Sequence, residues 1–287
     1  MRHGVKVKIW GTRGSMAAPY SDRMIFGGNT ACVSAQWDKE VAIFDCGTGI
    51  RALAEELLPQ FQDGVNVFHI FISHVHLDHV IGLPFFPFIY KKDCILHFYG
   101  ASDEKMSFEQ RMKQMAGPPY WPVSLDAAGA EMYWHDVNSG DRIDLPGGAV
   151  VRALHSNHPD CTLIFRLEKE DTSMVYGLDY ELTEDFASEY KEFIASCDLL
   201  LFDGMYSDSE IDQYRGFGHS TWEQGVQVAE ECQVKRLCIS HHDWSKTDNE
   251  LMRLEEAAKK RSSKCIFARE GMMFHLEEGS EVYVEKR

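Results

Sequence analysis

The sequence lacks the features that would mark a membrane or a secreted protein. No run of about 18 apolar residues occurs in its 287 residues, which excludes a transmembrane helix. Residues 1–8 include basic side chains but no apolar core, so we expect no secretory signal. The eight cysteines are scattered singly, without a C-x-x-C pair or a disulfide-like spacing. We therefore expect reduced thiols and a cytoplasmic protein.

Positive charge is also scarce. Lysine and arginine number 29 against 45 acidic residues, and the net charge is −16 with histidine neutral. Proteins that hold long nucleic acid usually present a basic face that releases counterions from phosphates. Here the basic clusters are short, at 91–92, 259–261 and 286–287. We expect a small-molecule substrate rather than long nucleic acid, and no membrane partner; a homodimer is left open.

The chain is long enough, and at 44% apolar residues hydrophobic enough, to bury one large core. Strand-like and helix-like segments alternate without a linker, which predicts one α/β domain over 1–287. The predicted helices are 50–58, 103–115, 184–195, 221–231 and 249–262. The predicted strands are 5–10, 31–37, 41–45, 67–73, 95–99, 132–136, 149–154, 162–167, 174–176, 198–202, 234–240, 266–269, 272–276 and 282–284.

The densest group of metal-binding side chains is the segment 74–79, which reads His-Val-His-Leu-Asp-His. It directly follows the apolar, strand-like run 67–73. Side chains two apart on an extended chain point the same way, so His74 and His76 can face one ion. Asp78 and His79 follow after a turn and can face a second ion. Imidazole and carboxylate without thiolate are typical of a catalytic zinc site, or of a related borderline metal.

Further candidate ligands follow other strand-like stretches. His158 comes after 149–154, Asp179 after 173–176 and His241 after 234–239. His155 could compete with His158 as a ligand, and Asp203 lies at a similar strand end to Asp179.

The spacing H-x-H-x-D-H resembles that of the metallo-β-lactamase superfamily. The sequence resembles the ribonuclease Z-like and phosphodiesterase-like branch most closely, through the segment 11–15 (Gly-Thr-Arg-Gly-Ser) and the segment 218–221 (Gly-His-Ser-Thr). The resemblance covers most of the chain. It implies a four-layer αβ/βα sandwich, in which two mixed sheets face each other and helices lie outside.

The resemblance also implies a ligand set for two divalent ions per chain. Zinc is expected first, with manganese or iron as alternatives. Asp203 stays open as a rival to Asp179 for the bridging position. The implied ligands of the first ion are His74, His76 and His158, those of the second are Asp78, His79 and His241, and Asp179 lies between the two ions.

Two ions about 3.5–4 Å apart can hold a shared hydroxide and polarise the bond that it attacks. His219 belongs to neither ion in this assignment. The resemblance implies that it protonates the departing oxygen, which suits the alkoxide of a phosphodiester. We therefore expect His219 and the metal-ligating Asp78 to act in catalysis by a metal-dependent hydrolase.

We expect this hydrolase to be a phosphodiesterase for small phosphodiesters such as cyclic nucleotides. A ribonuclease Z that grips tRNA is expected to carry a basic, flexible arm, and neither 100–131 nor 179–219 contains a Gly- and Lys-rich insertion. Two alternatives remain open: ribonuclease Z-like processing of RNA 3′ ends, and hydrolysis of a lactone or thioester at the same site.

Overall fold

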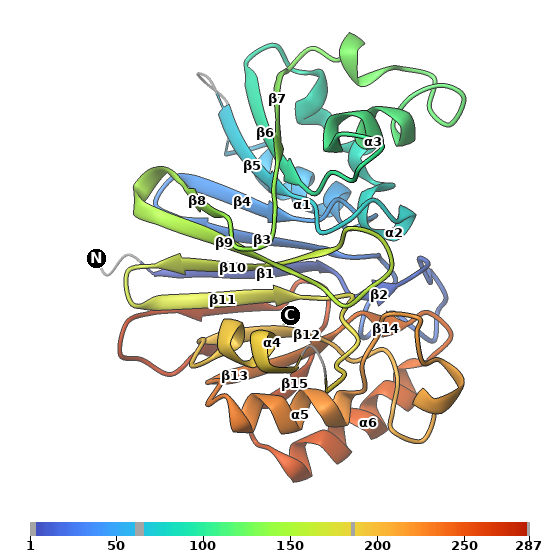
Figure 1. The fold of residues 1–287 in the computed structure, drawn as a ribbon, viewed down its shortest axis with the longest axis vertical. Helices are drawn as coiled ribbons and strands as arrows, with labels where there is room; N and C mark the ends of the chain where they lie inside the picture. The colour runs from blue at the N-terminus through green and yellow to red at the C-terminus, as the bar shows by residue number, and fades with distance from the viewer. Residues whose placement is uncertain (1–3, 61–65, 185–186, 286–287) are drawn as a thin grey trace.

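Two β-sheets lie face to face in the computed structural model, which describes residues 4–60, 66–184 and 187–285 (Figure 1). The first sheet has the strand order β17-β16-β1-β3-β4-β5-β6-β7 and the second has β15-β13-β12-β11-β10-β9-β8. The strands of the first sheet are β1 (Val5–Gly11), β3 (Cys32–Trp37), β4 (Glu40–Phe44), β5 (Asn66–Phe71), β6 (Cys94–Gly100), β7 (Glu131–Asp136), β16 (Met273–Leu276) and β17 (Tyr283–Glu285). Those of the second are β8 (Arg142–Asp144), β9 (Ala149–His155), β10 (Leu163–Lys169), β11 (Thr172–Gly177), β12 (Leu199–Asp203), β13 (Arg236–Ser240) and β15 (Cys265–Phe267).

Parallel strands set the position of the site. In the first sheet β4, β5, β6 and β7 run parallel, and in the second β11, β12, β13 and β15 do. The carboxyl ends of parallel neighbours meet at one edge of a sheet, which is where ligands of α/β proteins usually bind. The loops after β4, β5, β11, β12 and β13 can therefore bring their side chains together.

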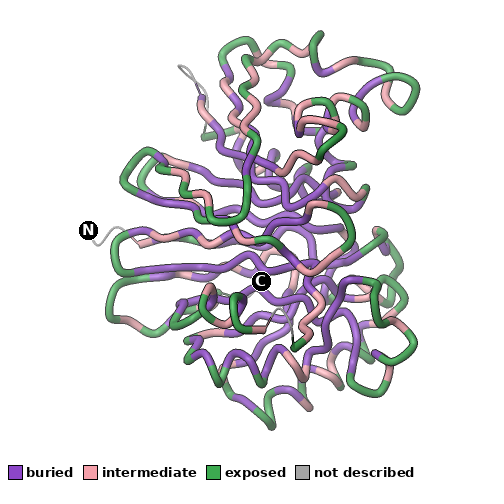
Figure 2. Tube along the Cα trace, viewed as in Figure 1, coloured by how far each residue is buried: buried purple, intermediate pink, exposed green. Residues whose placement is uncertain are grey.

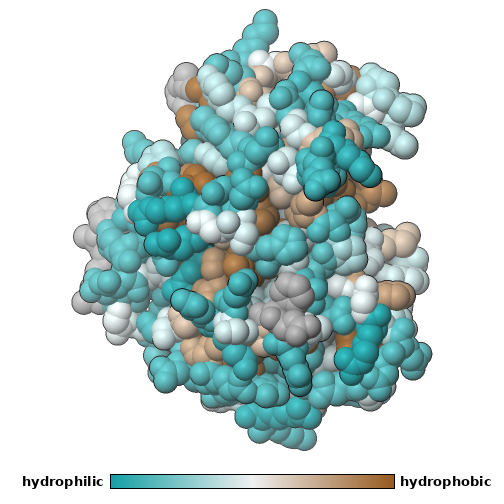
Figure 3. Space-filling model, viewed as in Figure 1, coloured by the Kyte–Doolittle hydropathy of each residue, from teal (hydrophilic) through white to brown (hydrophobic). Residues whose placement is uncertain are grey.

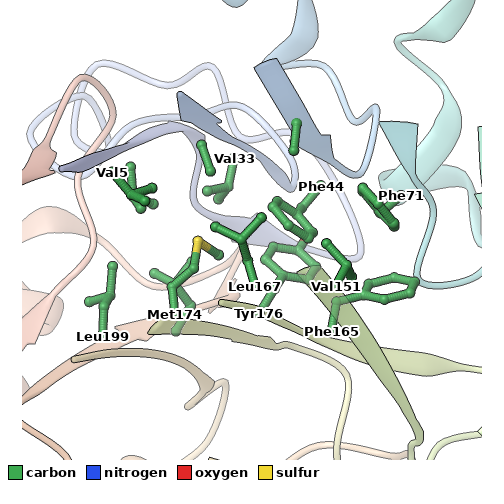
Figure 4. Close-up of a cluster of buried hydrophobic side chains, with 14 of the residues drawn as sticks. Val5, Val33, Phe44, Phe71, Val151, Phe165, Leu167, Met174, Tyr176 and Leu199 are labelled. Atoms are coloured by element: carbon green, nitrogen blue, oxygen red, sulfur yellow. The ribbon is translucent and has the colours of Figure 1, made fainter. Parts of the chain in front are cut away.

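The core between the sheets is apolar and aromatic. Phe44 stacks on Phe71 and on Tyr176, with ring centroids 5.4 and 5.5 Å apart, and Phe165 packs against both phenylalanines (Figure 4). These rings come from β4, β5, β10 and β11, so they join the two sheets. Buried chain follows the strands, and exposed chain is concentrated in the loops and the outer turns of the helices (Figure 2).

Helices cover the outer faces. Apolar side chains of α1 and α3 pack on the first sheet, and those of α4, α5 and α6 on the second (Figure 1). None of the helices in the described ranges is long and apolar enough to cross a membrane. The helices are α1 (Ile50–Leu57), α2 (Leu77–Val80), α3 (Phe108–Met115), α4 (Ala187–Ile194), α5 (Trp222–Glu231) and α6 (Asp248–Arg261).

The predicted helix 103–115 is too long at its start. Ser107 accepts a hydrogen bond from the backbone N–H of Gln110, and the Gln110 side chain accepts one from the N–H of Ser107. This capping box starts α3 at Phe108. Asp103 lies in the preceding loop, where its carboxylate accepts the N–H groups of Lys105 and Met106. The predicted helix 184–195 is α4, and its residues 185–186 lie outside the described ranges.

Candidate metal centre

The segment 74–79 follows β5 and ends in the single helical turn α2. His76 precedes this turn, and Asp78 and His79 lie within it, so all the donors of the segment face one volume. The structure brings the seven predicted ligands together there. Their donor atoms form three groups in which all atoms lie within 4.8 Å: His74, His76 and His158; His74, His79 and Asp179; and Asp78, His79 and His241.

Three loops deliver acidic or imidazole side chains through a left-handed backbone. Asp45 follows β4 with φ of 60°, Asp179 follows β11 with 54°, and His241 follows β13 with 58°. Residues other than glycine rarely adopt this conformation, and such strain is concentrated at functional sites. Each left-handed residue turns the chain sharply at the carboxyl end of its strand.

Asp179 lies at the centre of the group. Its Oδ2 is 3.1 Å from Nε2 of His79 and 3.3 Å from Nε2 of His241, while its Oδ1 is 3.8 Å from Nε2 of His158. Asp78 approaches the same two imidazoles on the second side, with Oδ2 3.1 Å from His79 and 3.3 Å from His241. A carboxylate that reaches histidines of both predicted ligand sets has the placement that a bridging ligand needs.

Asp45 orients His79. Its Oδ2 accepts the Nδ1–H of His79 at 2.7 Å, the hydroxyl of Ser73 at 2.8 Å and the hydroxyl of Tyr176 at 2.7 Å. The bond to Nδ1 leaves Nε2 of His79 to face Asp78 and Asp179. Carboxylate partners of this kind hold metal-ligating histidines in place in many proteins. The link between Asp45 and His79 spans 34 residues, so no local sequence pattern indicates it.

Asp203 plays the same part for His219. Nδ1 of His219 donates to Oδ2 of Asp203 at 2.7 Å, and the ring of His219 lies 5.2 Å from that of His158 and 5.1 Å from that of His241. The oxygens of Asp203 also accept the backbone N–H groups of Asp179 and Met205. The oxygens of Asp203 therefore already accept three hydrogen bonds. Asp179, Asp203, His219 and His241 form a fourth group of donor atoms within 4.8 Å.

Two glycines allow close approach to the imidazoles. A Cβ on Gly14 would lie 2.4 Å from Nδ1 of His241, and one on Gly218 would lie 2.0 Å from Nδ1 of His158. Gly218 also has φ of 86°, and its carbonyl accepts Nδ1–H of His158 at 2.9 Å. Both glycines belong to segments that carry the resemblance, so their presence there has a steric reason.

The N-terminal segment 11–15 closes one side of the centre. The backbone N–H of Ser15 donates to Oδ2 of Asp78 at 2.8 Å. Arg13 is fully buried, and its guanidinium donates to the carbonyls of Gly27, Asp243 and Lys246. It therefore ties this segment to the loop that follows β13. The two short strands β2 (Arg13–Gly14) and β14 (His242–Asp243) pair at the same point.

Charge in the centre is finely balanced. Burial alone would lower the pKa of His79, but Asp179, Asp78 and Asp45 outweigh it and hold that pKa well above its usual value. Burial opposes charge on His241 too, yet Asp179 and Asp203 raise its pKa to about 9. The pKa of Asp179 is held well below its usual value against burial, chiefly by His241 and His79. Protons on these imidazoles balance carboxylates that a divalent ion would otherwise balance.

Other candidates are placed away from the centre. His155 is exposed at the end of β9, so His158 is the histidine of that stretch that reaches the site. His242 is buried next to the rings of Phe26 and Phe267, with Nε2 3.0 Å from the carbonyl of Ala268. It therefore points away from the site.

The donors fit divalent metal ions. Nε2 of His74, Nε2 of His79 and Oδ2 of Asp179 are buried without a hydrogen-bond partner in the described part of the chain. Buried polar atoms normally have hydrogen-bond partners, and three unpaired atoms that converge and can ligate a metal are typical of a site completed by an ion. Their chemistry, imidazole nitrogen and carboxylate oxygen, suits zinc and related metals.

Comparison with known proteins agrees with the sequence and the fold. The model of the family described as "Beta-lactamase superfamily domain" matches residues 42–242. A ribonuclease Z of Picrophilus torridus is 24% identical over an alignment that covers 96% of this chain and 97% of that protein. The metallo-beta-lactamase fold protein YhfI from Bacillus subtilis superposes with a TM-score of 0.70 at 18% identity, covering 95% of this chain and 99% of that one. A diphosphatase from the PhnP family superposes with a TM-score of 0.66 at 17% identity, covering 94% and 96%.

The chain therefore belongs to the beta-lactamase superfamily, and the resemblance to its ribonuclease Z-like and phosphodiesterase-like branch is confirmed. Its fold is the metallo-β-lactamase sandwich predicted from the sequence. The cluster of histidines and aspartates identifies a metal-dependent hydrolase of this fold, with donors enough for a dinuclear site.

Proposed function

We propose that this protein is a phosphodiesterase that hydrolyses small phosphodiesters, such as cyclic nucleotides. One observation carries the proposal. His219 lies beside the candidate metal centre, 7% exposed, and Asp203 holds its Nδ1 at 2.7 Å. A fixed imidazole at that place can give a proton to an alkoxide leaving group, which is the step that a phosphodiester requires.

The ligand assignment is part of the proposal. Asp179 would bridge the two ions, since it reaches imidazoles on both sides of the centre. Zinc is the proposed metal, with manganese and iron as alternatives. Bound divalent ions would supply positive charge for the phosphate oxygens and acidify a water molecule so that it can attack at neutral pH. His74, His76 and His158 would hold one ion, and Asp78, His79 and His241 the other.

The protein's own residues have distinct tasks in this proposal. Asp45 fixes the tautomer of His79, and the Gly218 carbonyl fixes that of His158, so that each imidazole presents Nε2 to the centre. Asp203 does the same for His219, whose Nε2 would carry the proton for the leaving oxygen. Burial keeps bulk water from these hydrogen bonds, which strengthens them.

RNA 3′ processing is the second candidate, since a ribonuclease Z aligns with 96% of this chain. The charge of −16 favours a small substrate instead, because long RNA needs cations along its path. The intervals 100–131 and 179–219 contain α3, α4 and β12, and the loop 116–130 between α3 and β7 contains no lysine or arginine. A thioester releases a thiolate, which leaves without a proton, so the Asp203–His219 pair favours an oxygen ester over a thioester. A lactone also releases an alkoxide, and direct assay distinguishes it from a phosphodiester.

The cysteines support the cytoplasmic setting expected from the sequence. All eight are free thiols, and seven of them are buried. Burial raises the pKa of Cys46 and Cys238 well above the usual value, which keeps these thiols protonated and unreactive.

A panel of substrates tests the proposal. Protein loaded with zinc, manganese or iron would be assayed on 2′,3′- and 3′,5′-cyclic nucleotides, methyl p-nitrophenyl phosphate, p-nitrophenyl phosphate, a lactone and precursor tRNA. We expect the highest kcat/KM on a small diester and a metal content near two ions per chain. The proposal fails if the lactone or precursor tRNA exceeds every small diester. Asp179→Ala and Asp203→Asn would separate the two carboxylates: the first should lose metal, and the second should keep it.

A further inference from the structure

A large cavity opens beside the candidate metal centre. Its volume is about 810 Å³, within the usual size of small-molecule sites. Val75 and Leu77, which flank His76 in the chain, line it. Asp160 lines it too, and its Oδ2 lies 3.5 Å from Nε2 of His76. The cavity therefore adjoins the centre on the side of His76, whereas His219 does not line it.

The walls of the cavity are apolar and aromatic. Leu77 is 62% exposed, Phe85 54% and Tyr120 75%, which leaves large hydrophobic side chains facing solvent. Hydrophobic surface is visible at the edge of the molecule where α2 and α3 lie (Figure 3). Patches of this kind on a single chain usually bind something. The edge of Trp121 meets Phe85 at 5.0 Å between ring centroids, so the aromatic wall is ordered by its own packing.

Charge in the cavity excludes a second phosphate. Among its described lining residues, Arg111 is the one cation, and its guanidinium forms an ion pair with Asp103. Asp160 adds negative charge on the side of His76. A polyanion that continued from the metal centre into the cavity would meet no free cation there. An uncharged group would instead be stabilised by the burial of its apolar surface.

Two features of the walls favour an aromatic ring over an alkyl chain. Met106 and Met115 line the cavity, and thioether sulfur makes favourable contacts with aromatic rings. Trp121 lines the cavity, and its Nε1 is buried without a hydrogen-bond partner in the described ranges, so a ring heteroatom that reaches it would accept its N–H. A heteroaromatic ring satisfies both features, whereas an alkyl chain leaves the indole N–H unpaired.

We infer that this cavity holds the uncharged aromatic ring of the substrate, beside the metal centre on the side of His76. The phosphate part of this inference rests on the proposed function, and the ring-binding part rests on the cavity alone. The substrate class is accordingly a phosphodiester that carries one heteroaromatic group. A nucleobase and an aryl group share this chemistry.

Binding of phosphonates to the metal-loaded protein tests the inference without turnover. Titration calorimetry would compare methyl-, cyclohexyl-, phenyl- and pyridylphosphonate. We expect phenylphosphonate to bind roughly 10- to 100-fold more tightly than methylphosphonate, as burial of one ring predicts. Cyclohexylphosphonate should fall between them. Equal affinity of the methyl and phenyl compounds, or tighter binding of the cyclohexyl compound, would overturn the inference.

Variants place the effect in the cavity. Tyr120→Ala should remove most of the gain from the ring, and its exposed position makes misfolding a poor explanation. Tyr283→Ala, at another exposed tyrosine, on β17, is the matched control and should keep the gain. Trp121→Phe should weaken pyridylphosphonate and leave phenylphosphonate unchanged. A full gain in Tyr120→Ala would place the ring elsewhere.

A spectroscopic measurement separates this inference from the proposed function. Protein labelled with ¹³C at its methionine methyls would be titrated with phenol, which carries no phosphate. We expect ring-current shifts of the Met106 and Met115 signals, assigned with Met→Leu variants. If phenol shifts them while no phosphonate binds, the phosphodiesterase proposal fails and the ring site stands. If phenol leaves both signals unmoved, the ring site fails whatever the enzyme hydrolyses.

Discussion

Three histidines around the centre are oriented by the same kind of hydrogen bond. His79, His158 and His219 each give Nδ1–H to a fixed acceptor: the Asp45 carboxylate, the Gly218 carbonyl and the Asp203 carboxylate. Each bond selects the tautomer whose Nε2 is free to face the site. His219 differs from the other two in what its Nε2 faces. Nε2 of His79 and Nε2 of His158 approach Asp179, whereas His219 approaches that carboxylate only through Nδ1, at 3.9 Å.

His219→Ala should therefore keep metal and lose turnover. General acid catalysis contributes about 10²–10⁴-fold, so we expect a loss of that size on a diester with an alkoxide leaving group. The loss should shrink for p-nitrophenolate, which leaves without a proton. Metal content and kinetics on both substrates check this expectation. His155→Ala, at an exposed histidine outside the site, is the control and should behave as wild type. An equal loss for both leaving groups would remove His219 from proton transfer.

Asp45→Asn should weaken metal binding. Oδ2 of Asp45 accepts three hydrogen bonds, and Oδ1 accepts the N–H of Ser73 at 2.7 Å. An amide whose NH₂ replaces Oδ2 opposes the Nδ1–H of His79 directly, and one whose NH₂ replaces Oδ1 opposes the N–H of Ser73. Either orientation therefore disturbs the support of His79. We expect affinity for the ion at His79 to fall about 10- to 100-fold.

Competition with a chromogenic chelator measures this affinity, and circular dichroism checks the fold. Tyr176→Phe removes one of the three groups that donate to Oδ2 of Asp45 but leaves the acceptor of His79. Its loss of metal affinity should therefore be smaller. Unchanged affinity in Asp45→Asn would mean that His79 is held by its packing alone.

The sequence was sufficient to predict which candidate ligands come together but not the residues that support them. The H-x-H-x-D-H spacing and the strand-end positions of His158, Asp179 and His241 are local patterns, and the structure brings these side chains together. Asp45 and Ser15 act across 34 and 63 residues, on His79 and on Asp78. Such pairs depend on how the sheets are assembled, and a single sequence carries no periodic signal for that.

At the scale of elements, length decided what could be predicted. The long strands and α1, α5 and α6 agree with their predicted ranges to within one or two residues. Strands β2 and β14 have two residues each and α2 has four, too few to show a period. These short elements nevertheless shape the centre, since β2 carries Gly14 against the ring of His241.

A ladder of histidines crosses β5, β6 and β7. His69 stacks on His97 at 5.2 Å between ring centroids, and Nδ1 of His97 lies 3.1 Å from Nε2 of His135. Their places in register put these rings on one face of neighbouring strands. Burial, together with His97 and His135, lowers the pKa of His69 from 6.5 to about 4. The ladder is therefore a place where acid destabilises the first sheet.

The direction follows from proton linkage. Between pH 6.5 and about 4 the unfolded chain binds a proton at His69 that the folded chain does not. His69 therefore leaves the free energy of unfolding undiminished above pH 6.5 and lowers it as the pH falls through this window. His69→Gln removes the titration and keeps an acceptor for the Tyr99 hydroxyl, 3.1 Å from Nδ1 of His69.

Between pH 6.5 and 4.5, the free energy of unfolding of His69→Gln should fall by about 1–3 kcal/mol less than that of wild type, whatever the stability of the variant at pH 7. Urea unfolding at a series of pH values measures how the free energy of unfolding changes with pH in each protein. Parallel slopes would show that His69 is protonated in the folded protein.

At the scale of the whole molecule, fold and charge lead to different expectations about the substrate. The sandwich, with two facing sheets and helices outside, is the architecture that the alternating elements and the resemblance predicted (Figure 1). The same family includes a ribonuclease Z that aligns along nearly the entire chain. The net charge of −16 nevertheless argues against a long polyanion on this surface. Several basic side chains are also engaged locally, as Lys246 is with Glu210 and Arg269 with Glu255.

Salt dependence should distinguish these expectations. Each phosphate neutralised by a protein cation adds about 0.7–0.9 to the negative slope of log affinity against log salt concentration. A small diester held at the buried centre engages few surface cations. We therefore expect log kcat/KM to change with a slope of magnitude about 1 or less between 50 and 300 mM salt, roughly one phosphate's worth. The same series with precursor tRNA should show weak turnover throughout. Turnover of that RNA above every diester at low salt, falling with a slope of several, would show that the surface grips RNA despite its charge.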